Sequence, residues 1–332
     1  MNNFKVITEN IIKRILEENY ESTYDIIKKL YVLHEKGKTV IPPSYFLRFD
    51  KKSKKRIIAL PAAFKENNYK AVGIKWIASN PKNIDCGMRR ASATIILNDY
   101  VTGFPLACLE GSRISAFRTA CSAIIGADAI ISSRASFKRL GIVGAGPISQ
   151  SILNCFLKKK WSFDKILVHD LNTQRQQYFR KIFSDYHINE EHDLNSLIKH
   201  TDIIVLATSA LEPYINEIPA GYGQKIILHI SLRDICPQII SQNQNIVDDV
   251  EHVLRENTSV HLAYQLTQNK SFLTATIGKL LCDSTRQQFD DNHIIYSPMG
   301  LGVLDIAIAN FVYRYALEKD YGITIDNFMD EN

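Results

Sequence analysis

The chain has no apolar run long enough to span a bilayer, and its first residues lack the short apolar segment of a signal peptide. Its six cysteines show no CxxC spacing, and no cysteine–histidine cluster has the spacing of metal ligands. These absences argue against a membrane protein, a disulfide-rich secreted protein and a structural zinc site. We therefore expect a cytoplasmic protein with reduced thiols and no bound metal.

A strong charge of one sign is also missing. The formal net charge is +5, from 40 Lys and Arg against 35 Asp and Glu. The densest basic runs, residues 51–56 and 158–160, stand beside predicted turns or a helix end and contain no aromatic residues. Such runs are typical of solvated surface, so we expect neither nucleic acid nor a membrane as a partner.

What the sequence does contain is a glycine-rich loop between a predicted strand and a predicted helix. Residues 140–147 read LGIVGAGP, and the pattern Gly144, Gly146, Ser149 has the form GxGxxS. The first glycine of such a loop allows a sharp turn, and the second lets backbone N–H groups approach a pyrophosphate at the helix N-terminus. The sequence therefore predicts a dinucleotide site; the alternative is a glycine turn in a cofactor-free α/β domain.

The next predicted strand supports a dinucleotide site and indicates which dinucleotide it binds. Residues 165–170 form an apolar strand that ends in Asp170. A carboxylate there accepts hydrogen bonds from the ribose hydroxyls of NAD and repels the 2′-phosphate of NADP. We expect NAD as the cofactor, with NADP as the alternative because Arg175 lies shortly downstream.

Three hydroxyl residues follow later strands of the same pattern. Thr208 and Ser209 end the strand DIIVLATS, and Ser231 ends the strand at 225–231. We expect Thr208, Ser209 and Ser231 to face the cofactor. The alternative for Thr208 and Ser209 is that they only satisfy N–H groups of a turn.

The organisation of the chain changes after about residue 118. Residues 8–37 carry two helical patterns, and β-rich runs alternate with turns from residue 45 to 110. A helix is expected to start near Ser115. From about residue 137 to 250 strands alternate with helical segments, which indicates a parallel sheet. The strands expected in that sheet are residues 139–144, 165–170, 202–207, 225–231 and 245–249.

Because 332 residues are many for one core, we predict an α/β protein of two domains. A Rossmann-type doubly wound parallel sheet covers residues 119–299. An α+β domain covers residues 1–118 and 300–332, where a last helix has the length to pack back on the first part.

Four cations enter successive elements of the first domain, namely Arg48, Lys75, Arg90 and Arg118. Lys75 lies in a strand expected to be buried, where a lone ammonium is costly. It either pairs with an internal carboxylate or faces a site, where it meets a substrate carboxylate or a water. Each arginine alone is typical of a surface, but guanidinium groups bind carboxylates bidentately, so the four together indicate an anionic ligand.

Asp234 follows the strand at 225–231, at the end of the sheet where ligands of open α/β folds bind. An aspartate beside a nicotinamide would accept a proton or polarise water. The alternative is an aspartate that caps a helix or a turn.

These residues together resemble the ornithine cyclodeaminase/μ-crystallin family, over nearly the whole chain. The most specific pieces are the lysine of GIKWIASNP, the ILND…TGFPL turn, the SAFRTA helix start, the GAGPIS loop and the aspartate of SLRD. The resemblance implies a Rossmann domain and a dimerising substrate domain closed by the C-terminal helix. We therefore expect a homodimer.

The resemblance also implies roles for single residues. Arg48, Lys75 and Arg118 would hold the α-carboxylate region of an amino-acid substrate. Asp234 would be the catalytic carboxylate near the reacting nitrogen, with Lys75 as a second catalytic group. The residues that would hold NAD are Gly144, Gly146, Ser149, Asp170, Thr208 and Ser231.

Two departures from ornithine cyclodeaminases indicate a different substrate. This chain has Ile58 where those enzymes place a glutamate before the segment matching Leu60-Pro61, and it has Arg90 where they place a threonine. An acidic group is lost and a cation is gained, which favours a substrate tail that carries a carboxylate.

Taken with the resemblance, these residues predict an NAD-dependent oxidoreductase that acts on a CH–NH group. The expected reaction converts N-(2-amino-2-carboxyethyl)-L-glutamate to L-2,3-diaminopropionate and 2-oxoglutarate, for siderophore or antibiotic biosynthesis. The alternatives within the family are an ornithine cyclodeaminase, a cyclic-imine reductase and an alanine dehydrogenase. A non-catalytic dinucleotide or small-molecule binder is the alternative of another class, but such a protein has no need for both Lys75 and Asp234.

Overall fold

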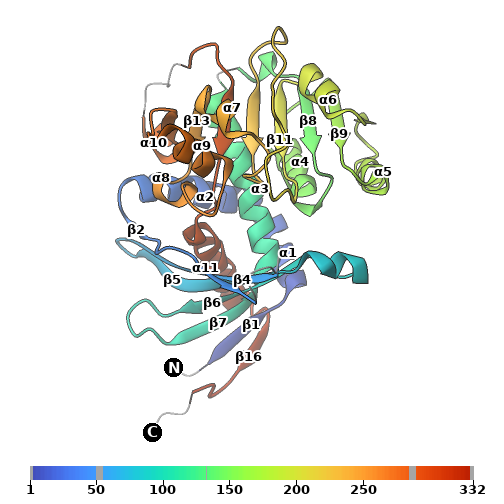
Figure 1. The fold of residues 1–332 in the computed structure, drawn as a ribbon. Coiled ribbons are helices and arrows are strands. Elements are labelled where there is room, and N and C mark those ends of the chain that lie inside the picture. The colour runs from blue at the N-terminus through green and yellow to red at the C-terminus, as the bar shows by residue number, and fades with distance from the viewer. Residues whose placement is uncertain (1–2, 50–54, 132, 284–288, 330–332) are drawn as a thin grey trace. The chain divides into compact units, whose positions relative to one another are not determined.

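The computed structural model describes residues 3–49, 55–131, 133–283 and 289–329. The chain divides into two units, which we call unit 1, Met1–Arg118 with Leu301–Asn332, and unit 2, Thr119–Gly300 (Figure 1). None of the helices in the described part of the chain combines the length and the hydropathy needed to cross a membrane.

Unit 1 is built on a mixed sheet with the strand order β16-β1-β7-β6-β5-β4-β2, and β3 pairs with β4. The β-rich runs predicted between residues 45 and 110 are confirmed as strands. Three further strands, β1, β2 and β16, were not expected because each is too short to show an alternating pattern. The bounds are β1 Phe4–Ile7, β2 Thr39–Val40, β3 Tyr45–Arg48, β4 Arg56–Glu66, β5 Tyr69–Ser79, β6 Ala91–Asn98, β7 Pro105–Glu110 and β16 Ile323–Ile325.

Helices cover one face of this sheet, which we call the inner face. The C-terminal helix α11 (Gly302–Glu318) packs on β4, β5 and β6. A Cβ added to Gly73 of β5 would lie 3.2 Å from the side chain of Ile306, so the helix and the strand approach closely. α1 (Glu9–Glu18) and α2 (Tyr20–Glu35), the two predicted N-terminal helices, pack against α11 in turn. Lys75 projects from β5 to this inner face and is buried.

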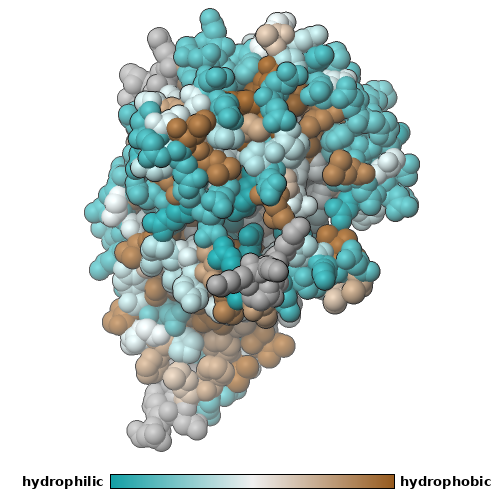
Figure 2. All heavy atoms as spheres, in the orientation of Figure 1, coloured by the Kyte–Doolittle hydropathy of each residue, from teal (hydrophilic) through white to brown (hydrophobic). Residues whose placement is uncertain are grey.

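The opposite face of the sheet, the outer face, carries apolar side chains that are half-buried or exposed. They alternate with the inner-face residues along each strand, and Trp76 is 43% exposed. Figure 2 shows hydrophobic residues gathered over β1, β6, β7 and β16 of this unit. The residues of the outer face include Ile57, Ala59, Pro61, Val72, Ile74, Trp76, Ile96 and Cys108.

The long helix α3 (Gly111–Ile130) begins four residues before the predicted start near Ser115. The carboxylate of Glu110 accepts the backbone N–H of Ser112 at 2.7 Å and that of Arg113 at 3.0 Å. An acidic group that satisfies the first N–H groups also complements the helix dipole. The expectation of a start near Ser115 was therefore wrong, because it overlooked this side-chain cap.

Unit 2 is an all-parallel sheet with the strand order β10-β9-β8-β11-β12-β15-β13-β14. The order reverses at β8, which lies between β9 and β11, so the predicted Rossmann-type doubly wound sheet is confirmed. All five predicted strands are present, and β10, β14 and β15 add to them. The bounds are β8 Arg139–Val143, β9 Lys165–His169, β10 Ile188–Glu190, β11 Ile203–Leu206, β12 Ile226–His229, β13 Gln244–Val247, β14 Leu273–Thr276 and β15 Ile294–Ser297.

The strands of unit 2 are joined mainly by helices, and their apolar faces pack into one core. Val143, Leu206 and Ile227 of the strands are buried with Leu197 and Ile240 of two helices. The helices of this unit after α3 are α4 Pro147–Lys158, α5 Thr173–Ile182, α6 Leu194–His200, α7 Pro237–Ser241, α8 Val250–Val253, α9 Ser259–Thr267 and α10 Ile277–Cys282.

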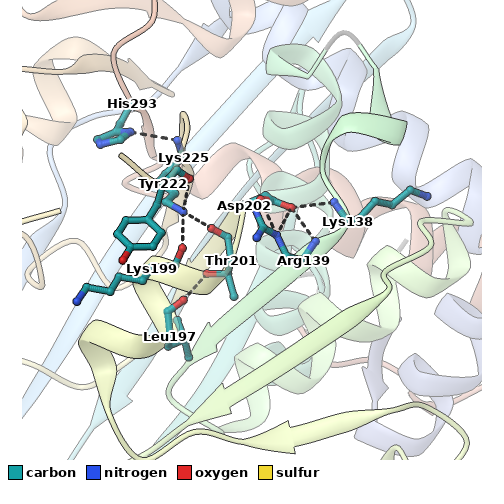
Figure 3. A network of polar contacts seen from close by, with 9 residues as sticks. All are labelled: Lys138, Arg139, Leu197, Lys199, Thr201, Asp202, Tyr222, Lys225 and His293. Carbon is teal, nitrogen blue, oxygen red and sulfur yellow. Dashed lines mark hydrogen bonds and ion pairs between the residues drawn. The ribbon is translucent and has the colours of Figure 1, made fainter. Parts of the chain in front are cut away.

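A polar network lies at the amino ends of β8, β11 and β12 (Figure 3). Lys225 is fully buried, and its ammonium donates to the carbonyls of Lys199, Thr201 and Tyr222 at 3.0, 2.6 and 3.0 Å. Two of these carbonyls stand at the C-terminal end of α6, where helix carbonyls lack partners within the helix. The hydrogen bonds of Lys225 thus connect the end of α6 and the turn at Tyr222 to the sheet.

The substitution Lys225→Met should lower the free energy of unfolding by about 2–4 kcal/mol, because three carbonyls, that of Thr201 buried, lose their donor. Urea unfolding followed by far-UV circular dichroism measures the change. The control Lys181→Met, which alters an exposed lysine of the same unit, should shift stability by less than about 0.5 kcal/mol. Equal stability of the two variants would show that the cap contributes nothing.

Candidate active site

The glycine loop of unit 2 joins the end of β8 to the start of α4. Gly144 has φ +92°, and a Cβ there would lie 2.6 Å from the carbonyl oxygen of Ala207. Only glycine fits this position without strain. Gly146 is different: its φ is −82°, it caps α4, and a Cβ there would meet no atom within 4 Å. The first glycine is required by the fold, whereas the second leaves open space at a helix N-terminus.

The structure brings Asp170 to this loop. Its carboxylate follows β9 and accepts the backbone N–H of Ala145 at 2.8 Å and that of Asn172 at 2.9 Å. Ser149 is buried, and its hydroxyl donates to the carbonyl of Gly144. Ser149 therefore holds the shape of the loop from within, and the open side of the loop is left to Gly146 and Asp170.

Three hydroxyl groups converge on the carboxylate of Asp234, which is fully buried. Thr208 donates to Oδ1 at 2.5 Å, Tyr214 donates to the same oxygen at 3.0 Å, and Ser231 donates to Oδ2. Thr208 also accepts the backbone N–H of Ala210 at 3.1 Å, which is the turn contact considered as its alternative role. Thr208 and Ser231, both expected to contact a cofactor, are thus grouped around Asp234, while Ser209 is exposed.

A buried histidine completes the surroundings of Asp234. The Nε2 atom of His229 lies 3.2 Å from Oδ2 of Asp234, and its Nδ1 atom lies 3.2 Å from the hydroxyl oxygen of Ser297. Burial alone would raise the pKa of Asp234, but His229 and the hydroxyls of Ser231 and Thr208 lower it to about 2. A carboxylate with this pKa is ionised at neutral pH and holds a proton poorly.

The buried Lys75 of unit 1 has a partner. The ammonium of Lys75 lies 2.6 Å from Oδ2 of Asp305 on α11 and 3.3 Å from the hydroxyl oxygen of Ser115. The guanidinium of Arg118 lies 3.4 Å from the same carboxylate, and it also donates to Ser115 at 3.4 Å. We call Lys75, Arg118, Asp305 and Ser115 the inner-face cluster. The internal carboxylate considered for Lys75 is therefore present.

This pairing leaves the inner-face cluster with two cations and one carboxylate. Burial lowers the pKa of Lys75 to about 8; the charge of Asp305 opposes this shift, and that of Arg118 adds to it. One positive charge beyond the pair favours a negatively charged ligand. A group with a pKa near 8 also exchanges a proton readily at neutral pH.

Arg48 and Arg90 do not contact the inner-face cluster. Arg48 is exposed on β3, with its guanidinium 5.2 Å from the ring centre of Phe46. Arg90 is exposed, and its guanidinium donates to the hydroxyl of Ser79 at 3.2 Å. In the described part of the chain no carboxylate forms an ion pair with Arg90. The structure thus brings Lys75 and Arg118 together and leaves the other two cations elsewhere on the sheet.

Sequence reasoning missed Asp305, Tyr214 and His229. A carboxylate within the otherwise apolar helix pattern LDIAIA was a usable signal, because a buried lysine and a buried aspartate each require a partner. Tyr214 and His229 gave no comparable signal, since tyrosine and histidine are common in cores and loops alike.

Comparison with known proteins adds to this geometry. A family model described as "Ornithine cyclodeaminase/mu-crystallin family" matches residues 10–320. The chain belongs to the ornithine cyclodeaminase/mu-crystallin family. The resemblance found in the motifs is thereby confirmed, and the glycine loop, Asp234 and the inner-face cluster are features of a member of this family.

Individual members of the ornithine cyclodeaminase/mu-crystallin family differ in their reactions. The chain is 28% identical over 320 residues to N-((2S)-2-amino-2-carboxyethyl)-L-glutamate dehydrogenase of Staphylococcus aureus, covering 93% of this chain and 94% of that protein. It is 24% identical to alanine dehydrogenase of Archaeoglobus fulgidus, covering 97% and 98%. A solved structure of Thermococcus litoralis Δ1-pyrroline-2-carboxylate reductase, with NADH and L-proline, has a TM-score of 0.86 at 21% identity, covering 97% and 100%.

Lys75 should lose its proton near pH 8, while exposed lysines titrate near 10.4. NMR of protein labelled with [ε-13C]lysine measures this, and the Lys75 signal is the one missing from a Lys75→Met variant. Removing the stabilising charge by Asp305→Asn should move the Lys75 titration to lower pH. A Lys75 signal that titrates with the other lysines would contradict the burial and pairing described above.

Proposed function

We propose that this protein is an NAD-dependent oxidoreductase that acts on the CH–NH group of an amino acid carrying several carboxylates. The observation that carries the proposal is the inner-face cluster, in which a buried lysine and a partly buried arginine share a single carboxylate. Such a cluster favours an anion, and a substrate carboxylate is the anion that an amino-acid enzyme supplies.

The glycine loop fits the proposed cofactor. Gly146 leaves open space at the N-terminus of α4, where backbone N–H groups and the helix dipole favour a pyrophosphate. Asp170 stands beside that space, at the end of β9, as a ribose-binding carboxylate does. Gly144, Gly146 and Asp170 would hold NAD, with Ser149 supporting the loop.

The substrate we favour is N-(2-amino-2-carboxyethyl)-L-glutamate. The similarity to the Staphylococcus aureus dehydrogenase extends over nearly the whole of both chains. Ile58 and Arg90 replace the acidic and neutral residues of cyclodeaminases, which favours a carboxylate over an ammonium at the substrate tail. The substrate carboxylates would be held by Arg48, Lys75, Arg90 and Arg118.

The proposed reaction consumes substrate, NAD and water and releases 2-oxoglutarate, L-2,3-diaminopropionate, NADH and a proton. NAD, when bound, supplies the acceptor for the hydride that leaves the glutamate Cα. Water then adds to the resulting carbon–nitrogen double bond of the substrate, and the carbon–nitrogen bond breaks to give the ketone and the amine.

Asp234 and Lys75 would have different roles in this reaction. Asp234, held ionised by its hydroxyl donors, stabilises the positive charge that develops on the substrate nitrogen. The original expectation that Asp234 accepts a proton fits a pKa near 2 poorly. Lys75, with a pKa near 8, is better suited to take the amine proton or to orient the attacking water.

A direct assay tests the proposal. The protein is incubated with NAD and N-(2-amino-2-carboxyethyl)-L-glutamate while absorbance of NADH is followed, and 2-oxoglutarate is sought by mass spectrometry. We expect a net rise in NADH together with equimolar 2-oxoglutarate. Turnover of ornithine without net NADH, or turnover restricted to alanine or proline, would replace this substrate with that of another family member.

The substitution Asp234→Asn should lower kcat by about 10²- to 10⁴-fold while the dissociation constant of NADH changes by less than about 3-fold. Stopped-flow absorbance and the quenching of protein fluorescence by NADH give the two values. The matched control Asp164→Asn, which neutralises an exposed carboxylate of the same unit, should leave both unchanged. Full activity of Asp234→Asn would remove Asp234 from the mechanism.

The two glycines of the loop should respond differently to alanine. Gly146→Ala should fold normally but weaken NADH binding by about 10-fold or more, roughly 1.4 kcal/mol, because its added methyl group occupies space meant for the ligand. Gly144→Ala should instead lower the free energy of unfolding by about 1–3 kcal/mol, owing to its φ and the Ala207 carbonyl. Unchanged NADH affinity in Gly146→Ala would argue against a dinucleotide at this loop.

We also propose that the protein works as a homodimer through the outer face of unit 1. That face exposes apolar side chains, including Trp76, on several neighbouring strands. Apolar surface of this kind is typical of interfaces between copies of a chain. Light scattering coupled to size exclusion measures the mass in solution, and a monomer at micromolar concentration would overturn the assignment.

A further inference from the structure

The ring of His229 faces two different groups of Asp234. His229 ends β12 and is fully buried. Its Nε2 atom accepts the backbone N–H of Asp234 at 3.2 Å and also lies 3.2 Å from the carboxylate oxygen Oδ2 of the same residue. The other ring nitrogen, Nδ1, lies 3.2 Å from the hydroxyl oxygen of Ser297 at the end of β15.

One ring nitrogen cannot serve both groups of Asp234 at once. A nitrogen with a lone pair accepts the backbone N–H, whereas a nitrogen that carries a proton donates to the carboxylate. The backbone contact therefore assigns the proton of a neutral ring to Nδ1, which donates to Ser297. In a protonated ring both nitrogens are donors, so the backbone N–H loses its acceptor and Nε2–H turns to Oδ2.

The loop between His229 and Asp234 is held in a strained form. Leu232 has φ +68°, a left-handed conformation that leucine rarely adopts, and its carbonyl accepts the backbone N–H of Ser259 at 2.7 Å. The carbonyl of Asp234 accepts the backbone N–H of Tyr214 at 2.9 Å. Such strain persists only where the surrounding contacts impose it. The backbone of Asp234 is thus fixed by its neighbours, with its N–H directed to the ring.

Asp234 is the charged group that the ring of His229 contacts. Tyr214 is the second titratable group at that carboxylate; burial and the charge of Asp234 raise the pKa of its phenol, so it stays neutral. In the described part of the chain no lysine or arginine forms an ion pair with either His229 or Asp234. A proton taken up by the ring would therefore turn a pair with one negative charge into a pair with none.

We propose that His229 is the positioning residue of Asp234 and the proton switch of its charge. The neutral ring holds the backbone of Asp234 and leaves the carboxylate its negative charge, while the protonated ring binds the carboxylate and cancels that charge. The inference rests on the proposed function and deepens it, because the charge of Asp234 is what stabilises the substrate nitrogen there.

Turnover should therefore fall on the acid side as the ring of His229 takes up its proton. Asp234 itself, with a pKa of about 2, cannot account for such a loss in the range where histidines ordinarily titrate. A fall in that range would thus report the ring and not the carboxylate.

Long-range 1H–15N NMR of the histidine rings tests the assignment on the full-length chain without any turnover. The His229 signals are those missing from a His229→Gln variant. We expect the neutral ring to carry its proton on Nδ1, and Nε2 to gain one as the pH falls. Asp234→Asn removes the carboxylate that favours the charged ring, so it should move this uptake to lower pH by about one pH unit or more.

A second measurement compares kcat of His229→Gln and of the unaltered protein in the assay of the proposed reaction. A glutamine amide offers both an N–H and a carbonyl, so it can contact both groups of Asp234 without titrating. Any fall caused by Lys75, which has a pKa of about 8, is common to both proteins and cancels in the ratio of their kcat values. Below the midpoint of the ring titration this ratio should rise by about 10-fold per pH unit, with KM within about 3-fold.

The matched control is His187→Gln, which makes the same change at an exposed histidine of unit 2. It should leave the ring signals of His229 and the pH profile of kcat unchanged. Thermal melting and the affinity for NADH show whether each variant is folded.

Three outcomes would refute the switch. They are a neutral ring with its proton on Nε2, a proton uptake that Asp234→Asn does not move, and a kcat ratio that stays flat with pH. If the ring titrates as expected while no substrate yields NADH, the contact between His229 and Asp234 stands and the proposed reaction falls.

Discussion

The buried carboxylate of Asp305 is the interaction on which unit 1 depends. An isolated charge in a protein interior is costly, so Lys75 of β5 requires a partner, and α11 supplies it at 2.6 Å. Arg118, at the end of the unit 1 part of α3, contacts the same oxygen. Three segments far apart in the sequence are thus held by one carboxylate. Because Lys75 and Arg118 share this carboxylate, one positive charge remains that favours an anion. The same contact therefore holds the segments together and creates a cationic site.

The buried carboxylate of Asp234 has different surroundings from that of Asp305. No lysine or arginine of the described residues pairs with it. The hydroxyls of Thr208, Tyr214 and Ser231 donate to it, and the ring of His229 lies 3.2 Å away. These contacts lower the pKa of Asp234 and keep its carboxylate ionised, whereas the carboxylate of Asp305 is shared by two cations.

Strand register determines which charged side chains of unit 1 lie side by side. Arg48, Arg56 and Ser79 lie in line across three strands, so charges that are distant along the chain act at one place. A change of one residue in the register would move every side chain to the opposite face.

The sequence by itself determined the parallel sheet, the glycine loop and the family, because strand–helix alternation and the GxGxxS spacing are local patterns. It also singled out Lys75 and Asp234, since a charge in an apolar run is visible without a structure. Only the tertiary structure decided what those charges meet: Asp305 lies 230 residues from Lys75, and Tyr214 and His229 reach Asp234 from separate segments. Arg56 looked like part of a solvated basic run until register placed it beside Arg48. The partner of a buried charge depends on how distant segments pack together. A local sequence pattern contains no information about that packing.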